Sequence, residues 1–328
     1  MSARNLLLTL VAVLALAAIA CGGGGEGVAP QTTAATETAA VTASPGIETP
    51  SPAPVELYPV TVTDSNGREV KVELPPQRII ALAPSFVEIF FAIGAGNSVV
   101  AVDENTDFPE EAAALTKLSG FQPSVEGIAA LNPDLVLIFF DPGGLQEALE
   151  RLGIPVLFLA FPSSVEEVFD QIELLGRVTG HEDEAEAVAA EMRDGIDEII
   201  GKLAGLDQGP SIFHELTTDL WTVGPGSFVH DLYTLLKVEN IAEATGLPAT
   251  QMSAEAIIAA DPEVIILADA EFGDSPETVA ARPGWSNMAA VRNGRIYAVD
   301  PDIVSQPGPR LVEGLETLAR LLYPERFQ

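Results

Sequence analysis

Three histidines, His181, His214 and His230, are the only imidazole side chains in this 328-residue chain. His214 and His230 are each followed directly by an acid, Glu215 and Asp231. Imidazole and carboxylate groups together bind transition metals, so these two pairs are candidate metal ligands. His181 opens a His-Glu-Asp-Glu run and is interpreted as the solvated start of a helix. Beyond these pairs the sequence has no clustered metal-binding motif.

Sequence motifs for catalysis are missing from the chain. There is no Gly-x-Ser-x-Gly, His-Glu-x-x-His or Walker sequence. Gly94-x-Gly96 lacks a third glycine and follows an expected helix rather than a strand, so it is not a dinucleotide fingerprint. We therefore expect no enzymatic activity, and any associated ATP hydrolysis would occur on a separate subunit.

The charge and the cysteine content exclude several classes of protein. The chain carries 16 Lys and Arg against 48 Asp and Glu, a formal charge of −32. Such acidity argues against binding nucleic acid and against a polybasic membrane-binding surface. Cys21 is the only cysteine, which excludes an internal disulfide and any zinc or iron–sulfur site built from cysteines. The length predicts two domains rather than one.

The N-terminus has the pattern of a targeting segment. The apolar run Leu6–Ala20 is short for a membrane-spanning helix and typical of a signal peptide, here residues 1–20. Small residues precede Cys21 as in a lipobox, so we expect Cys21 to be lipidated; the alternative is ordinary cleavage beside an incidental cysteine. Residues 21–57 contain no Lys, Arg or aromatic residue and are interpreted as a disordered tether of roughly 30–36 Å reach. Residues 58–328 retain 15 basic and 44 acidic residues, a net charge of −29.

Apolar runs after the tether predict an α/β fold. A hairpin is expected around Asn66-Gly67, and a capping box from Ser85 to Glu88 predicts a helix that ends at Gly94. Helical stretches between the apolar strands predict a parallel sheet covered by helices. The expected strands are 78–83, 99–103, 135–140, 156–160, 211–216, 264–268 and 295–299.

The middle of the chain has a helical pattern without strands. From Ser163 to Gly205 apolar residues recur every three or four positions, which indicates one face of a long helix. That face comprises Val188, Met192, Ile196, Ile199 and Leu203. The predicted organisation is therefore an α/β lobe over 58–162, a helical segment over 163–207 and an α/β lobe over 208–328. A final amphipathic helix is expected over 309–322.

An internal repeat supports two related lobes. Residues 124–138 align without gaps to residues 253–267, with matching Ser, Glu, Ile, Ala and Pro. Each copy predicts a short helix capped by Ser124 or Ser253, a stop marked by proline, and a buried strand.

Several further motifs occur in a specific order along the chain. They are Ala83-Pro84-Ser85-x-x-Glu88, Trp221-Thr-Val-Gly-Pro-Gly-Ser-Phe228, Arg282-Pro-Gly-Trp285-Ser286, Asn293-Gly-Arg-Ile-Tyr297 and Gln306-Pro-Gly-Pro-Arg310. With the repeat, they make residues 58–328 resemble the substrate-binding proteins of ABC transporters that import cobalamin, ferric siderophores or haem. The resemblance implies two Rossmann-like lobes joined by a single long backbone helix, a ligand cleft between the lobes, and only small lobe motion. It also implies a monomer that delivers a small-molecule ligand to a membrane permease and, through it, to an ATPase.

In this family one surface glutamate on each lobe engages arginines of the permease. The matching positions are Glu126 and Glu255, which occupy the same place in the two repeat copies. Two carboxylates on opposite lobes can fix the orientation of docking. The alternative is that each glutamate lies at the third helical position after its serine cap and only completes a helix start.

The resemblance also implies ligand-binding residues at the carboxyl ends of the strands. Phenylalanines give flat apolar contact but can instead belong to the core, and Trp285 is interpreted as structural. We expect Arg310 to reach a corrinoid amide or phosphate, or an anionic siderophore. The candidate ligand-binding residues are Pro84, Ser85, Phe121, Gln122, Phe139, Phe140, Glu215, Trp221, Phe272 and Arg310.

The expected ligand is a corrinoid or a ferric chelate, with a corrinoid slightly favoured because the candidate residues include only one base. Haem bound through His214, Met252 or a tyrosine is an alternative. Metal-binding relatives use more histidines, so we expect neither a resident metal nor a cofactor. An extracellular enzyme or sensor on the same scaffold is the competing class of function.

Overall fold

The structure is a computed structural model that describes residues 58–141, 143–270 and 273–327. The described residues all belong to one compact unit. The predicted signal peptide 1–20, Cys21, the predicted tether 21–57 and Phe272 lie outside the described residues.

The described chain alternates short strands and helices, as the sequence predicts. The strands are β1 (Val60–Thr63), β2 (Glu69–Val72), β3 (Ile79–Ala81), β4 (Val99–Asp103), β5 (Thr116–Leu118), β6 (Leu135–Ile138), β7 (Val156–Phe158), β8 (Ser211–Glu215), β9 (Trp221–Val223), β10 (Glu239–Asn240), β11 (Ala249–Gln251), β12 (Val264–Leu267) and β13 (Ile296–Ala298). The helices are α1 (Pro84–Ala92), α2 (Glu110–Ala113), α3 (Val125–Ala130), α4 (Leu145–Glu150), α5 (Val165–Thr179), α6 (Glu182–Gly201), α7 (Phe228–Leu235), α8 (Ala254–Ala260), α9 (Pro276–Ala280), α10 (Ala289–Arg292), α11 (Pro301–Val304) and α12 (Leu311–Leu322). Single 3₁₀ turns are η1 (Gly96–Ser98), η2 (Glu243–Thr245) and η4 (Trp285–Asn287).

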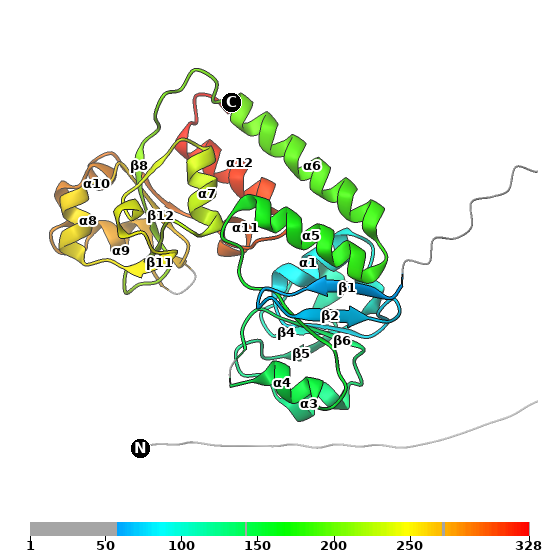
Figure 1. Ribbon diagram of the computed structural model, residues 1–328. Helices are drawn as coiled ribbons and strands as arrows, with labels where there is room; N and C mark the ends of the chain where they lie inside the picture. Colours follow the sequence, from blue (N-terminus) through cyan, green and yellow to red (C-terminus); the bar gives the residue numbers. More distant parts are fainter. Residues whose placement is uncertain (1–57, 142, 271–272, 328) are drawn as a thin grey trace, which may run out of the picture. The chain divides into compact units, whose positions relative to one another are not determined.

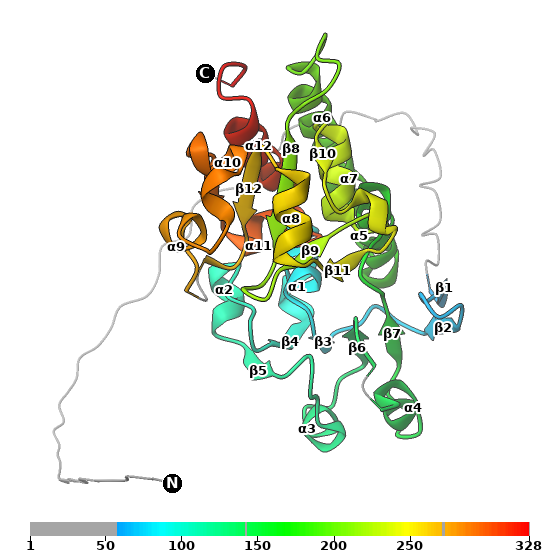
Figure 2. The same cartoon turned by 90° about the vertical axis from the view of Figure 1, so that its left-hand side faces the viewer.

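Five parallel strands form the sheet of the N-terminal lobe. Their order is β5-β4-β3-β6-β7, and Figure 2 shows the labels in this sequence from left to right. The central strands β3 and β6 are buried along their whole length, as expected for a sheet covered on both faces. The chain adds β4 and β5 on one side of β3 and then crosses to β6 on the other. The direction of winding therefore reverses between β3 and β6.

Four parallel strands form the sheet of the C-terminal lobe, in the order β10-β8-β12-β13. Val264 of β12 lies opposite Ile212 of β8, and Leu267 lies opposite Glu215. Small antiparallel pairs flank the two sheets. One is the predicted hairpin β1-β2 around Asn66-Gly67, and the other pairs β9 with β11.

Two helices, α5 and α6, connect the two sheets (Figure 1). No strand interrupts the chain between β7 and β8, in agreement with the sequence. Ser164 caps α5, and Gly180, with a φ of +76°, ends it. α6 is the long helix of this segment, and Met192, Ile196 and Ile199 lie on its buried face as predicted. α6 packs against α5, which follows the N-terminal sheet, and against α12, at the end of the C-terminal lobe. It therefore contacts elements on both sides of the connection between the sheets.

The internal repeat folds as two equivalent helix–strand units. Ser124 accepts a hydrogen bond from the Gly127 amide at the start of α3, and Ser253 does the same for Ala256 at the start of α8. Each helix is followed by a fully buried strand, β6 or β12. The two copies therefore place their glutamates in the same local structure.

The prediction of a capping box at Ser85 is wrong. The helix begins two residues earlier, with Ala83 rather than Ser85 as the cap and Pro84 in the first turn, and no side chain caps it. Proline suits this position because it lacks the amide hydrogen that a cap would otherwise bind. Glu88 is thereby free of a capping role and binds Arg310 instead.

Across the described ranges, none of the helices combines the length and the apolar character needed to cross a membrane.

Candidate functional site

A cavity of about 580 Å³ lies at the carboxyl ends of both parallel sheets. From the N-terminal lobe its wall includes Ala83 to Phe86, directly after β3, and Phe139, directly after β6. From the C-terminal lobe it includes Leu216 after β8 and Ala268 after β12. Open parallel sheets bind ligands in the crevice where the winding reverses, and β3 and β6 flank that point. The volume falls within the roughly 300–1,000 Å³ typical of small-molecule sites.

Exposed phenylalanines form one side of this cavity. The rings of Phe121 and Phe139 meet edge to face with centroids 5.4 Å apart, and Phe140 lies 6.2 Å from Phe121. Phe121 is 57% exposed and Phe140 45%. Phe161, also in the cavity wall, is 54% exposed and packs on Phe228. Aromatic rings left in water around a concave surface are a common sign of a binding site.

The cavity wall includes four of the residues predicted from the sequence. Pro84, Ser85, Phe121 and Phe139 line it, and Phe140 packs against two of these rings without lining it. Gln122 and Trp221 are exposed but outside the wall. Phe272 is outside the described residues. Sequence reasoning missed Phe161, although its place three residues after the end of β7 was a usable signal.

The expectation that Arg310 reaches into the cavity is not met, because its guanidinium binds another side chain instead. Its Nε and Nη2 donate to the two carboxylate oxygens of Glu88 at 3.1 and 2.6 Å, and its Cζ lies 4.1 Å from the Phe108 ring centroid. Glu88 is 3% exposed, and burial raises the pKa of its carboxyl although Arg310 opposes that rise. A buried carboxylate needs such a partner. The pair joins α1 of one lobe to the residue before α12 in the other.

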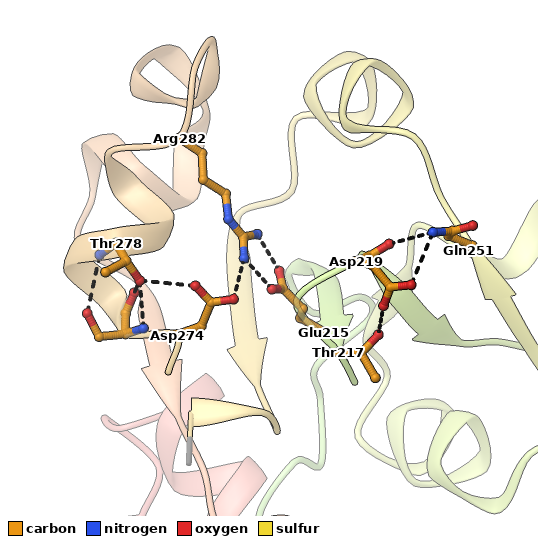
Figure 3. A network of polar contacts seen from close by, with 8 residues as sticks. Glu215, Thr217, Asp219, Gln251, Asp274, Thr278 and Arg282 are labelled. Carbon is orange, nitrogen blue, oxygen red and sulfur yellow. Dashed lines mark hydrogen bonds and ion pairs between the residues drawn. The ribbon is translucent and has the colours of Figure 1, made fainter. Parts of the chain in front are cut away.

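Glu215 is likewise engaged by an arginine and lies outside the cavity wall. Arg282 donates to both of its carboxylate oxygens, at 2.7 and 2.5 Å, and also to Asp274 at 2.7 Å (Figure 3). The Arg282 guanidinium also lies 4.7 Å from the ring centroid of the buried Trp285. Glu215 is fully buried, and burial raises the pKa of its carboxyl to about 7. This network links β8 to the segment before η4, so Glu215 has a structural role.

Asp269 completes a carboxylate group beside this network. Oxygens of Glu215, Asp269 and Asp274 lie within 4.8 Å of one another, a spacing compatible with a metal ion. Asp269 is fully buried, and within the described ranges neither of its carboxylate oxygens has a hydrogen-bond partner. Burial, and then the charge of Asp274, raise the pKa of Asp269. Arg282 offsets one of the negative charges of this group through its ion pairs with Glu215 and Asp274.

The residues considered as haem ligands lie away from the cavity. His214 is fully buried with its Nδ1 2.7 Å from the Tyr233 hydroxyl, and Met252 packs beside the cluster around Trp285. Among the described residues that line the cavity there is no His, Met, Tyr or Cys. The described wall therefore offers no side chain for axial ligation of haem iron.

The cavity wall is acidic, which the sequence analysis did not anticipate. Asp103, Asp107 and Asp302 line it, and its described residues include no Lys or Arg. Asp103 has a structural role as well, because its carboxylate accepts hydrogen bonds from the amides of Asn105 and Gly120 at 2.9 and 2.8 Å. Ser85, Gln171 and Gln306 add uncharged polar groups.

Glu126 and Glu255 are exposed on short helices and do not line the cavity. Each lies at the second helical position, because the amides that bind the serine caps belong to Gly127 and Ala256. The expectation of a glutamate at the third position, completing a capping box, is therefore wrong. Glu126 accepts a hydrogen bond from the Ser124 hydroxyl at 3.2 Å, and no ion pair to either glutamate occurs within the described chain.

Comparison with known proteins gives consistent similarities. A family profile described as periplasmic binding protein matches residues 79–303. The uncharacterized ABC transporter substrate-binding lipoprotein YvrC of Bacillus subtilis is 34% identical over 282 residues, covering 83% of this chain and 88% of that protein. A cobalamin-binding protein of Halobacterium salinarum is 29% identical over 279 residues, covering 81% of this chain and 74% of that protein.

Solved structures with the same fold bind different ligands. The periplasmic heme-binding protein RhuT from Roseiflexus sp. RS-1 superposes with a TM-score of 0.69 at 26% identity, covering 77% of this chain and 99% of that one. The periplasmic vitamin B12 binding protein BtuF of Vibrio cholerae superposes with a TM-score of 0.67 at 25% identity, with the same coverage.

Proposed function

Because the chain belongs to the periplasmic binding protein family, we propose that it captures a corrinoid or a ferric chelate outside the cytoplasm and delivers it to an ABC importer. In this role the protein is a binding protein and not an enzyme. Its partners are the importer permease and, through the permease, the ATPase.

The observation that carries this proposal is the cavity at the carboxyl ends of both sheets. Phe121 and Phe139 line it with aromatic side chains beside Pro84 and Ser85, which suits a broad, mostly apolar ligand with polar edges. A corrinoid has that character. Similarity to cobalamin-binding and vitamin B12-binding proteins points in the same direction.

Ferric-siderophore or haem binding is the second candidate, favoured by the similarity to a haem-binding protein. Purified protein incubated separately with cyanocobalamin, a ferric hydroxamate, a ferric catecholate and hemin, then desalted, distinguishes these ligands by absorbance. We expect retention of the corrinoid spectrum in near-stoichiometric amount. Retention of none of the coloured ligands would contradict the transport proposal and favour an enzyme or sensor on this scaffold.

Permease docking is proposed to use Glu126 and Glu255. Both carboxylates are exposed, lie in equivalent helix starts and come from the two different lobes. An exposed carboxylate at such a position is available to an arginine of a partner protein. Uptake measurements with both glutamates replaced test this assignment.

Lipid anchoring is proposed through Cys21, which the sequence pattern supports. Replacing Cys21 with alanine is expected to move the protein from the membrane fraction to the soluble extracytoplasmic fraction. Unchanged membrane association of the variant would contradict a lipid anchor at this residue.

A further inference from the structure

The described cavity wall carries acidic side chains and no basic ones, which is unusual for a site that binds a metal chelate. Asp103, Asp107 and Asp302 line it, and none of its described residues is a Lys, Arg or His. Asp103 is only 2% exposed and uses its carboxylate to hold neighbouring amides. Asp107 and Asp302 are more accessible, and neither forms an ion pair within the described part of the chain.

Asp107 and Asp302 approach the cavity from different sheets. Asp107 follows β4 in the N-terminal lobe, whereas Asp302 belongs to α11, after β13 in the C-terminal lobe. Burial raises the pKa of Asp302, and the charge of Asp107 adds to that rise. A ligand in the cavity therefore lies within reach of both negative charges.

Arg310, which interacts with Asp302, is already paired with an acid. Arg310 lowers the pKa of Asp302, but its guanidinium is held by both oxygens of Glu88 and covered by the Phe108 ring. Arg310 and Glu88 together carry no net charge. Arg310 therefore offsets the negative charge of the two aspartates only in part, because it is already paired with Glu88.

We propose that Asp107 and Asp302 determine the ligand class by charge, selecting neutral or cationic chelates and rejecting anionic ones. This inference rests on the proposed function, because it concerns the same cavity. Like charges inside a partly enclosed cavity are screened less than on an open surface, so their repulsion discriminates between ligands of similar shape. Corrinoids bearing amide groups and cationic hydroxamate chelates fit this selection. Ferric catecholates, with several negative charges, and haem, with its propionates, do not.

Matched pairs of probes that differ by one positive charge test the selection. One pair is aquocobalamin, a cation in mildly acidic solution, and neutral cyanocobalamin. The other is cationic ferrioxamine B and its neutral N-acetyl derivative. Using the full chain at low salt, we expect the cationic member of the pair that binds to have an affinity about tenfold higher. In the Asp107→Asn, Asp302→Asn double variant this ratio should fall to about twofold or less, and hemin should bind more tightly than to the parent protein.

The double variant Glu186→Gln, Glu191→Gln is the matched control, because it removes the same charge from exposed positions on α6. It should leave the affinity ratio unchanged. Equal affinities for the two members of a pair in the parent protein, or a ratio that Asp107→Asn, Asp302→Asn does not alter, would overturn the charge selection alone. If no corrinoid, ferric chelate or hemin binds either protein, the proposed function fails and the charge selection fails with it.

Discussion

His214 illustrates how strongly burial decides the behaviour of a single residue. Its side chain is fully buried in β8, with Nδ1 2.7 Å from the Tyr233 hydroxyl and with no partner for Nε2 among the described residues. Because a charged imidazole is poorly solvated there, burial lowers the pKa of His214 to about 4. His214 is therefore neutral at physiological pH, and inside the core its Nδ1 contacts the Tyr233 hydroxyl.

This gives a prediction for the pH dependence of stability. The folded pKa of His214 lies below its ordinary value of 6.5, so the unfolded state binds the proton more readily. The stabilising contribution is present above pH 6.5 and is lost as the pH falls toward 4, by up to about 3 kcal/mol. Urea unfolding across this range should show a shallower loss of stability for His214→Asn than for the parent. Parallel pH curves for the two proteins would contradict the assignment.

At the scale of elements, close approach of three loops positions the aromatic side of the cavity. Gly120 follows β5, and its amide donates to the carboxylate of Asp103 at the end of β4. A Cβ atom at Gly120 would lie 2.5 Å from that carboxylate and 2.7 Å from the Leu82 carbonyl oxygen. Glycine is therefore required for this contact, and Phe121 follows it directly.

Gly120→Ala is predicted to displace Phe121 and to destabilise the protein. The overlap with the Leu82 backbone should cost about 1–3 kcal/mol of unfolding free energy, together with a loss of ligand affinity. Urea unfolding and ligand titration measure the two effects. Gly201→Ala, at the end of α6 where an added Cβ meets nothing within 4 Å, is the control and should be neutral or slightly stabilising. Equal behaviour of the two variants would show that the contact at Gly120 is not restrictive.

At the scale of the whole molecule, the repeated helix–strand units put one exposed glutamate on each lobe. Glu126 and Glu255 occupy equivalent positions at the starts of α3 and α8, outside the cavity wall. A permease that contacts both glutamates would recognise the two lobes together. The proposed docking surface is therefore separate from the cavity.

Replacing both Glu126 and Glu255 with alanine should leave ligand affinity unchanged and abolish ligand uptake, because both carboxylates lie outside the cavity wall and bind the permease in the proposed docking. Transport of radiolabelled ligand into cells or reconstituted vesicles measures uptake, and titration of the purified variant measures affinity. Glu186→Ala combined with Glu191→Ala removes the same charge and should retain uptake. Normal uptake by the Glu126 and Glu255 variant would eliminate this docking assignment.

The sequence by itself determined the α/β fold, the hairpin, most strand positions and the repeat. These features depend on local periodicity, turn residues and caps, as at Asn66-Gly67 and Ser124, which a chain displays without its partners. Four of the residues that it predicted for ligand binding, Pro84, Ser85, Phe121 and Phe139, line the cavity, because residues after parallel strands gather at one edge of a sheet.

Only the tertiary structure decided which charged side chains form ion pairs and which do not. Arg310 binds Glu88, 222 positions away, and Arg282 binds Glu215, 67 positions away. Sequence shows the types of these residues but not their partners, since ion pairs depend on distances set by the folded chain. The same reason explains why the sequence did not single out Asp107 and Asp302, which line the cavity and form no ion pair within the described chain.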